Sequence, residues 1–459
     1  MFTPLVADDF IISVYSNYVI EDSWWQVTYG AFAQSLGGTH FTVLNALLSG
    51  YWLKIWLSLS QELHLNLHFG FWFAKVVVYA IWFFALRYFV FRTLHLKGDR
   101  IKIDFVLVLS FATVLQIHTL WSNDPVTNYV FAGFLPVAFA FVTLAKFFEY
   151  SLNPTFSKML IVSIFSIASL LFYEINFAIV PVFILVAILE LRSKVSFMYK
   201  YALLRLTPAI FTVITFVLLR TYTGKNANAY EGTTILFSFT SIKAFLINLA
   251  GAFPASTWPI SSRLEGLYFS VQLMFILVLL LSLVGYFHKI YDREKITKSS
   301  VSALVNKESI ILCSLSIWGL GAIAIQSLTP KIQAEVNVIG KVYTSYATSA
   351  SVMTILIASL ILRKIDTKNN ITIAFFLLLA AAQISLNFAL NSKIWDTMNP
   401  NVRLISVATT PTDSVTRCMA LNQWLEVNWP PYYSAGTVRG LNVYSESINN
   451  EPFCESPKK

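Results

Sequence analysis

The sequence contains few charged residues. Asp, Glu, Lys and Arg make up 12% of the 459 residues, whereas 56% are hydrophobic, and the mean hydropathy is +0.64. A soluble globular domain has about twice that share of charged residues. The composition therefore excludes an ordinary soluble globule and indicates an integral membrane protein.

The hydrophobic runs also lack the strict alternation of transmembrane β-strands. They are continuous, rich in Leu, Ile, Phe and Ala, and long enough to cross about 30 Å of hydrocarbon as helices. We therefore predict an all-α polytopic membrane protein with about ten to eleven transmembrane helices, an external interfacial helix and a small exported C-terminal tail. The predicted spans lie near 70–91, 103–121, 130–148, 159–173, 175–191, 203–219, 266–287, 309–328, 346–362 and 370–390.

Lys and Arg are distributed unevenly between the two sets of turns. Most lie in the turns 92–102, 146–158, 192–205, 289–307 and 363–368. The opposite turns, 122–129, 174, 220–265 and 329–345, are poor in them. Cytoplasmic turns carry the excess of basic residues, so the first set is predicted to be cytoplasmic and the second external. The net charge of +9 is then mainly a topology signal, and nucleic acid is not expected as a partner.

Residues 1–69 are predicted to form an external segment ahead of the bundle. Two aspartates stand where a basic n-region would lie, so we expect no cleavable signal. An exported amino end normally follows a first crossing, and we therefore expect a missing upstream segment or an unrecognised first helix. The run from Phe41 to Leu59 is interrupted by polar residues and is expected to lie in the interface. If it crossed the membrane instead, Asp8 and Asp9 would move to the cytoplasm.

The predicted bundle spans 70–390, and residues 391–459 form the exported tail. The tail contains a strand-like run from Val402 to Ala408 and a helix-like stretch from Ser414 to Glu426. Cys313 lies in a span and is expected to pack there, whereas Cys418 and Cys454 both lie in the tail, where a disulfide can form. Aromatic residues near Pro430, namely Trp424, Trp429, Tyr432 and Tyr433, suit either the membrane interface or stacking on sugar rings.

One acidic motif and the architecture together carry a family resemblance. Asp8-Asp9-Phe10 lies at the start of the first outer loop, followed by a surface helix with Tyr29-Gly30 and Gly37-Gly38, further crossings and an exported tail. This layout resembles the GT-C glycosyltransferases. The resemblance implies transfer of a sugar from a polyprenyl-phosphate donor to a glycan, lipid or protein acceptor on the outer or lumenal face, in a bacterial cell membrane.

The chemistry of that reaction suits the acidic pair. Polyprenyl phosphate is already a leaving group, so the enzyme must deprotonate the acceptor hydroxyl and stabilise the departing phosphate. One of Asp8 and Asp9 would be the general base. Its neighbour would orient the acceptor or, as in metal-using relatives, help to hold Mg or Mn. Without that chemistry, either residue would serve as the N-cap of a helix beginning at Phe10.

Two further acidic residues are candidates. Asp124, in Trp121-Ser122-Asn123-Asp124-Pro125, occupies the loop where some family members bear a second acidic motif, although Asn-Asp-Pro is also a turn signal. Glu174 lies at the tip of a tight outer hairpin between two apolar runs. An ionisable group at membrane depth tends to be functional, so Glu174 is assigned to the active site or acceptor site.

Outer cations and tyrosines are candidates for holding the donor's phosphate: Arg263, Lys331, Lys341, Tyr343 and Tyr346. The histidines lack a metal-ligand spacing, so no metal ligands are assigned. Two other functions stay open. A polysaccharide or lipid-linked-oligosaccharide transporter would need polar residues along several spans. A surface-glycan polymerase or ligase would carry a large, arginine-rich outer loop.

Overall fold

The structure is a computed structural model that describes residues 22–37, 42–63, 67–93, 107–108, 110–118, 124–129, 131–191, 198–224, 235–253, 304–336, 341–364, 370–408, 410–426 and 431–454. Within these ranges the chain forms helices and turns, and no β-strand. The helices are α2 (Trp24–Gly37), α3 (Val43–Leu63), α4 (Leu67–Thr93), α6 (Leu135–Leu152), α7 (Phe156–Phe172), the 3-10 helix η3 (Glu174–Ile179), α8 (Val180–Leu191), α9 (Met198–Gly224), α10 (Phe239–Ala252), α13 (Leu304–Ser327), α14 (Pro330–Glu335), α15 (Ser345–Lys364), α16 (Asn370–Thr397), α17 (Asn399–Ala408), α18 (Ser414–Leu425) and α19 (Pro431–Asn449).

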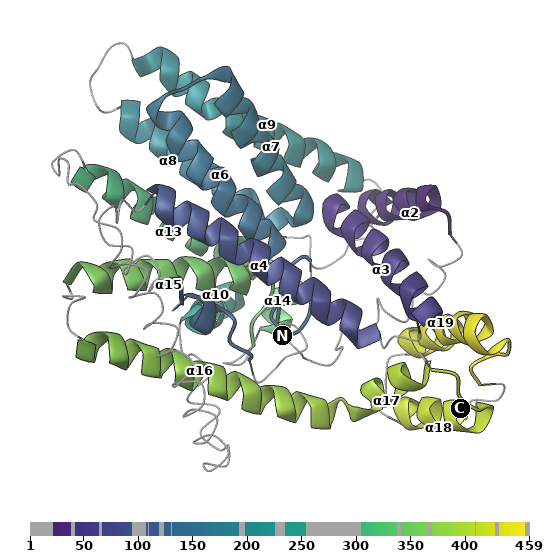
Figure 1. Cartoon of the computed structure of the whole chain (residues 1–459). Coiled ribbons are helices and arrows are strands. Elements are labelled where there is room, and N and C mark those ends of the chain that lie inside the picture. The colour runs from purple at the N-terminus through teal and green to yellow at the C-terminus, as the bar shows by residue number, and fades with distance from the viewer. Residues whose placement is uncertain are drawn as a thin grey trace.

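Among the described residues, five helices are long and apolar enough to cross a membrane. They comprise His68–Thr93, Leu135–Leu152, Leu204–Tyr222, Ile310–Ser327 and Leu377–Thr397. Shorter apolar helices, including α7, α10 and the start of α15, lie beside them in the bundle (Figure 1). Length and composition thus indicate an all-helical, membrane-embedded protein. The total number of crossings stays a prediction.

Most predicted spans are helical where the structure describes them. The runs near 70–91, 159–173, 203–219, 309–328, 346–362 and 370–390 fall within α4, α7, α9, α13, α15 and α16. The run 175–191 is divided between η3 and α8, and the run near 130–148 becomes helical at Leu135. The run 266–287 lies outside the described residues.

The prediction of one continuous helix over 103–121 is wrong. The helix ends in a turn at Leu115, and residues 116–118 are not helical. Side chains replace the lost helical hydrogen bonds: Asn387 on α16 accepts from the Ile117 N–H at 2.8 Å and donates to the Leu115 carbonyl at 2.7 Å. Apolarity alone predicted a helix here, but a backbone break inside a bundle is tolerated when neighbouring side chains satisfy it.

Turns of the first predicted set lie together at one end of the bundle, and turns of the second set lie together at the other end. At the predicted inner end, Arg92 lies 3.6 Å from Glu149, and Tyr150 donates to the Leu204 carbonyl. At the predicted outer end, Arg220 lies 3.9 Å from Glu174. Turns assigned to one side by charge are therefore in contact with one another. Which end faces outward stays a prediction.

Helices α2 and α3 lie at the same end of the bundle as α17–α19, on the right of Figure 1. On α2, Trp24, Trp25 and Tyr29 are exposed, as expected for aromatic residues at headgroup level. Trp52 on α3 stacks on Phe73 of α4 with ring centroids 5.7 Å apart. The interfacial position of the amino-terminal segment stays a prediction.

The C-terminal helices α17, α18 and α19, with the residues that follow to Cys454, form a small cap. The strand predicted over Val402 to Ala408 is wrong, because these residues belong to α17. Asn401, Leu404, Ile405 and Ala408 are buried, and their spacing is the helical i, i+3, i+4, i+7 pattern. The helix predicted over Ser414 to Glu426 is confirmed by α18.

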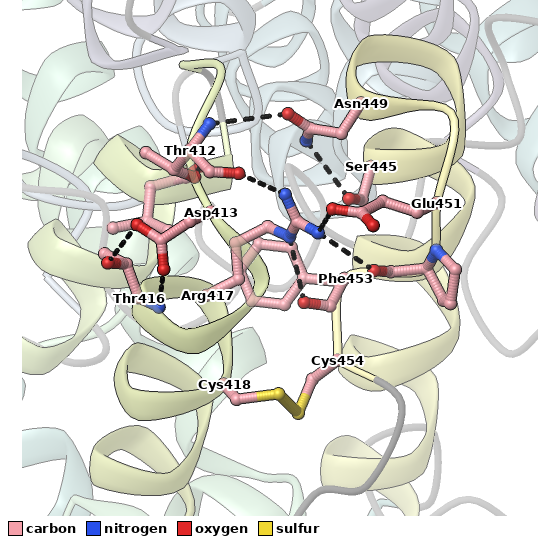
Figure 2. A network of polar contacts seen from close by, with 12 residues as sticks. Thr412, Asp413, Thr416, Arg417, Cys418, Ser445, Asn449, Glu451, Phe453 and Cys454 are labelled. Carbon is pink, nitrogen blue, oxygen red and sulfur yellow. Dashed lines mark hydrogen bonds and ion pairs between the residues drawn. A yellow bond between two sulfur atoms is a disulfide. The ribbon is translucent and has the colours of Figure 1, made fainter.

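A buried arginine and a disulfide fasten the end of the cap (Figure 2). Arg417, fully buried on α18, donates from Nε to the Phe453 carbonyl at 3.1 Å, and also donates to the Thr412 carbonyl and the Glu451 carboxylate. The Cys418–Cys454 disulfide lies beside it. The predicted pairing of these cysteines is thus present in the structure.

Two other tail and span predictions are corrected. Trp424 lies neither at an interface nor against a sugar, because it is buried within the cap and its indole N–H donates to Asn401 at 2.9 Å. Cys313 is exposed on α13 rather than packed. Trp429 lies outside the described residues.

We predict that Arg417→Gln loosens the cap. The Thr412 and Phe453 carbonyls would lose their donor, which costs roughly 2 kcal/mol or more. Amide hydrogen exchange of α19 should report this loss. Arg403→Gln is the matched control, because Arg403 is exposed and, within the described part of the chain, bonds only to the Gln423 side chain, and its effect should stay within about 0.5 kcal/mol. Equal exchange in both variants would contradict the prediction.

We also predict that the cap loses stability as the carboxylate of Asp413 is protonated. Asp413 caps α18 by accepting from the Thr416 N–H at 2.8 Å and the Thr416 hydroxyl at 2.7 Å, and these bonds hold the pKa of Asp413 below its usual range. Its contribution is full above the unfolded-state pKa of about 3.9 and is lost as pH falls through the lower folded-state pKa. Asp413→Asn keeps a capping oxygen, so its cap unfolding should be less acid-sensitive than that of the wild type.

Candidate functional site

Asp124 is the centre of a buried turn at the predicted outer end of the bundle. One carboxylate oxygen, Oδ1, accepts from the Val126 N–H at 2.9 Å. The other, Oδ2, accepts from the His118 N–H at 2.7 Å and from His118 Nδ1 at 3.0 Å. Asp124 and His118 are both fully buried. The carboxylate therefore organises the turn and fixes the imidazole with its Nδ1 proton toward Asp124.

Helix α4 supports the same turn from the bundle. Lys75 donates to the Thr127 carbonyl at 2.7 Å, and Tyr79 donates to the Val126 carbonyl at 2.7 Å. Lys75 is 1% exposed and lies in the first third of a long apolar helix. A buried lysine at membrane depth is expensive and is a default candidate for function.

The start of α15 closes over His118. The rings of Tyr346 and His118 meet edge to face with centroids 4.6 Å apart. The Tyr346 hydroxyl donates to the Val114 carbonyl at 2.8 Å, which anchors this tyrosine to the broken end of the 110–115 helix. The sequence analysis named Asp124 and Tyr346 for separate roles, and the structure brings both residues against His118.

Hydrogen bonds connect the start of α15, which packs on His118, to the tip of the predicted outer hairpin. Gln326 on α13 accepts from the Ser345 N–H at 2.9 Å and donates to the Thr344 hydroxyl at 2.7 Å. Thr344 donates to the Tyr173 hydroxyl at 3.0 Å, and Tyr173 precedes Glu174. We call His118, Asp124, Tyr173, Gln326, Thr344 and Tyr346 the polar cluster.

Glu174 begins η3 beside the polar cluster and faces a cation. Its carboxylate lies 3.9 Å from Arg220 near the end of α9, with both side chains partly exposed. The predicted break between the two apolar runs is present, since α7 ends at Phe172 and η3 begins at Glu174. A partly exposed ion pair contributes little to stability. What the pair brings to this end of the bundle is a carboxylate and a guanidinium group.

The predicted phosphate-binding residues are only partly brought together. Tyr343 stands between Tyr129, at a centroid distance of 6.0 Å, and the Lys331 ammonium, 5.7 Å from its ring. Lys331 also lies 3.9 Å from Glu335. Lys341 is half-buried at the start of the segment leading to α15. Asp8, Asp9 and Arg263 lie outside the described residues.

Three charged or ionisable residues of this region were missed from the sequence. Lys75 carried a detectable signal, because it is a lone charge within a long apolar run. Arg220 and His118 carried no sequence signal of function apart from their position in or near predicted outer turns. His118 was considered only as a metal ligand, and its partner, six residues later, cannot be inferred from sequence spacing.

No three of the metal-binding side chains in the described ranges gather to hold an ion. The two oxygens of Asp124 are already occupied by N–H donors.

The chain was compared with protein-family models, with curated proteins and with solved structures, and nothing matched. Its function is therefore inferred from the residues themselves.

We predict that Gly251→Ala disturbs the site from α10. A Cβ at Gly251 would lie 2.6 Å from Val342 Cγ1, just before the polar cluster, and the Gly251 carbonyl accepts from Gln116 at 3.3 Å. Overpacking of this kind costs about 1–3 kcal/mol, which exceeds the gain in helix propensity.

Gly30→Ala is the matched control, because a Cβ added at Gly30 on α2 would meet nothing within 4 Å. This variant should gain up to about 1 kcal/mol from helix propensity. Thermal unfolding in detergent measures both effects, and a stabilised Gly251→Ala would show that the α10 contact is not tight.

Proposed function

We propose that this protein is a membrane glycosyltransferase of the GT-C type. It would move a sugar from a polyprenyl-phosphate donor to a glycan, lipid or protein acceptor on the outer face. The observation that carries the proposal is the convergence of Asp124, Glu174 and Tyr346 at one end of an apolar bundle. Asp124 and Glu174 come from two separate predicted outer turns, and Tyr346 is the first residue of the predicted span that follows the outer turn 329–345.

The arrangement suits a donor whose chain lies in the membrane and whose headgroup lies at its surface. Apolar helices supply the contact with the polyprenyl chain, and the polar cluster lies where a phosphate at their end would arrive. Arg220 and Lys331 place a guanidinium and an ammonium group at that end, each beside a carboxylate, and such groups would donate hydrogen bonds to the departing phosphate.

Asp8 and Asp9 keep the roles that the resemblance implies. One carboxylate would accept the proton of the acceptor hydroxyl as its oxygen attacks the anomeric carbon, and the bond from that carbon to phosphate would break. Single displacement inverts the anomeric configuration. Glu174, turned toward Arg220, would hold the acceptor or position that arginine.

We predict that Asp8→Asn or Asp9→Asn abolishes transfer while expression is retained. An amide cannot take the proton, and general-base catalysis contributes about 10²–10⁴-fold. The assay is transfer of radiolabelled sugar from a panel of polyprenyl-phosphate hexoses to envelope glycan and lipid of the producing cells, by protein reconstituted in nanodiscs.

Asp413→Asn serves as the matched carboxylate-to-amide control, because Asp413 lies in the cap, and it should transfer at the wild-type rate. Unchanged turnover in both amino-terminal variants would remove the acidic pair from the mechanism. Absence of transfer by the wild type with every donor would contradict the proposed function itself.

A further inference from the structure

We propose that residues 235–239 and the outward face of α10 insert into the phospholipid leaflet at the predicted outer face, with Lys243 among the lipid phosphates. The sequence placed this region in the outer turn 220–265, between two spans. The inference goes beyond the proposed function, because it concerns the contact between the protein and the bilayer and does not depend on sugar transfer.

Large apolar side chains are exposed along this region. Ile235 and Phe237 are each 78% exposed, and Phe239, the first residue of α10, is 82% exposed. Ile242 and Leu246 continue the exposed row along α10 at helical spacings of three and four residues. A helix that met water on this side would carry polar residues there. The row is therefore suited to an apolar medium.

The opposite face of α10 packs on the bundle. Ala244, Ile247 and Gly251 are buried, and Ile247 clusters with Ile332 and Tyr343. A helix that is apolar all round is typical of a protein core or a membrane. Since the bundle covers only one side of α10, the exposed side needs a second apolar environment.

A backbone hydrogen bond places this segment at the end of a helix that is long enough to cross. The candidate span in α13 covers Ile310–Ser327, and the next residue, Leu328, accepts from the Leu236 N–H at 2.8 Å. The side chains around Leu236 are therefore level with the end of a span, where a membrane surface is expected.

Helix α10 is too short to cross the membrane by itself. Its 14 residues extend about 21 Å at 1.5 Å per residue, whereas the hydrocarbon core is about 30 Å thick. A short helix with an exposed apolar face at the end of a span is expected to enter one leaflet only.

Gln333 on α14 fixes the segment in its exposed position. Its amide nitrogen donates to the Leu236 carbonyl at 2.8 Å and to the Ser241 hydroxyl at 2.9 Å. Its amide oxygen accepts from the Ser238 and Thr240 hydroxyls at 3.0 and 2.7 Å. Ser238 and Ser241 also form a capping box at the start of α10. The apolar side chains are thus presented outward on a backbone held from α14, as in surfaces that bind membranes.

Lys243 favours phospholipid over a second protein as the occupant of this surface. Its side chain is exposed beside the apolar row, and α10 contains no acidic residue. A lysine enclosed in a protein interface is costly unless a carboxylate pairs with it. At a bilayer surface its aliphatic stem lies among acyl chains while the ammonium group reaches the phosphates. Phospholipid therefore supplies both the apolar and the anionic groups that this surface needs.

The test measures how deeply two positions lie in the bilayer. Phe237→Cys and Lys243→Cys are labelled with the fluorophore nitrobenzoxadiazole in a Cys313→Ser background, because Cys313 is exposed and Cys418 is paired with Cys454. The full-length protein is placed, one copy per disc, in nanodiscs of phosphatidylethanolamine and phosphatidylglycerol. These discs contain a lipid with a spin label either near the end of an acyl chain or on the headgroup.

The two quenchers should act in opposite order at the two positions. The chain-labelled lipid should quench the fluorophore at position 237 more strongly, and the headgroup-labelled lipid should quench the one at position 243 more strongly. Glu426→Cys is the control, because Glu426 is exposed at the end of α18 in the cap. Its fluorophore should be quenched by aqueous iodide and hardly by the chain-labelled lipid.

Three results would overturn the proposal. Quenching of position 237 by iodide would show that the segment meets water. Shielding of that position from both iodide and lipid would show that another part of the chain covers it. Iodide quenching in single-copy discs that disappears at high protein density would identify a second copy as the occupant.

A measurement on the wild type covers the case in which a labelled variant fails to fold. Protein in nanodiscs is irradiated with a phospholipid that carries a diazirine in its acyl chain, and the modified peptides are identified by mass spectrometry. Residues 235–246 should carry the adduct, as should the exposed face of α9 around Val217 and Leu218. Adducts on α9 without adducts on 235–246 would overturn the proposal.

Discussion

The structure depends on satisfying main-chain hydrogen bonds where the chain leaves the helix at Leu115 inside an apolar bundle. Each unpaired N–H or carbonyl in such surroundings carries a penalty of several kcal/mol. Asn387 pairs with the backbone at 115–117, Asp124 with the His118 N–H, and Lys75 with the Thr127 carbonyl. The break is thus held by side chains from three parts of the chain.

The same requirement explains why the candidate site is where it is. Once the chain leaves the helix at Leu115, His118 and Asp124 are buried, and Tyr346 at the start of α15 packs on His118 and bonds to the Val114 carbonyl. Gln326 and Thr344 then extend the hydrogen bonds to Tyr173. The polar cluster is thus built around the end of one helix at Leu115 and is completed by residues of α13, of the start of α15 and of the α7–η3 junction.

The extent to which the sequence predicted this structure differs between elements. Helices such as α4 and α16 were predicted correctly, because a continuous apolar run long enough to cross a membrane rarely forms anything other than a helix. The strand-like run at Val402 to Ala408 was misread, because a short β-branched stretch does not show whether its period is 2 or 3.6 until its partners are known. The helix break at Leu115 was missed because the side chain that satisfies its backbone hydrogen bonds is Asn387, which is distant in sequence.

The candidate site shows the same limit. Position in predicted outer turns was enough to single out Asp124, but the role of an acidic residue depends on what its oxygens are bonded to, which sequence spacing does not contain.

The cap gives independent evidence about the side on which this site lies. Its Cys418–Cys454 disulfide closes beside a buried Arg417, and disulfides persist in oxidising compartments. His68 on α4 stacks on Trp395 of α16, with ring centroids 5.6 Å apart, where α16 approaches the cap. The end of the bundle that bears the cap is thus the end of α4 opposite to the basic turn 92–102. We therefore propose the orientation that the basic turns also predict, with the cap and the polar cluster toward the outer face.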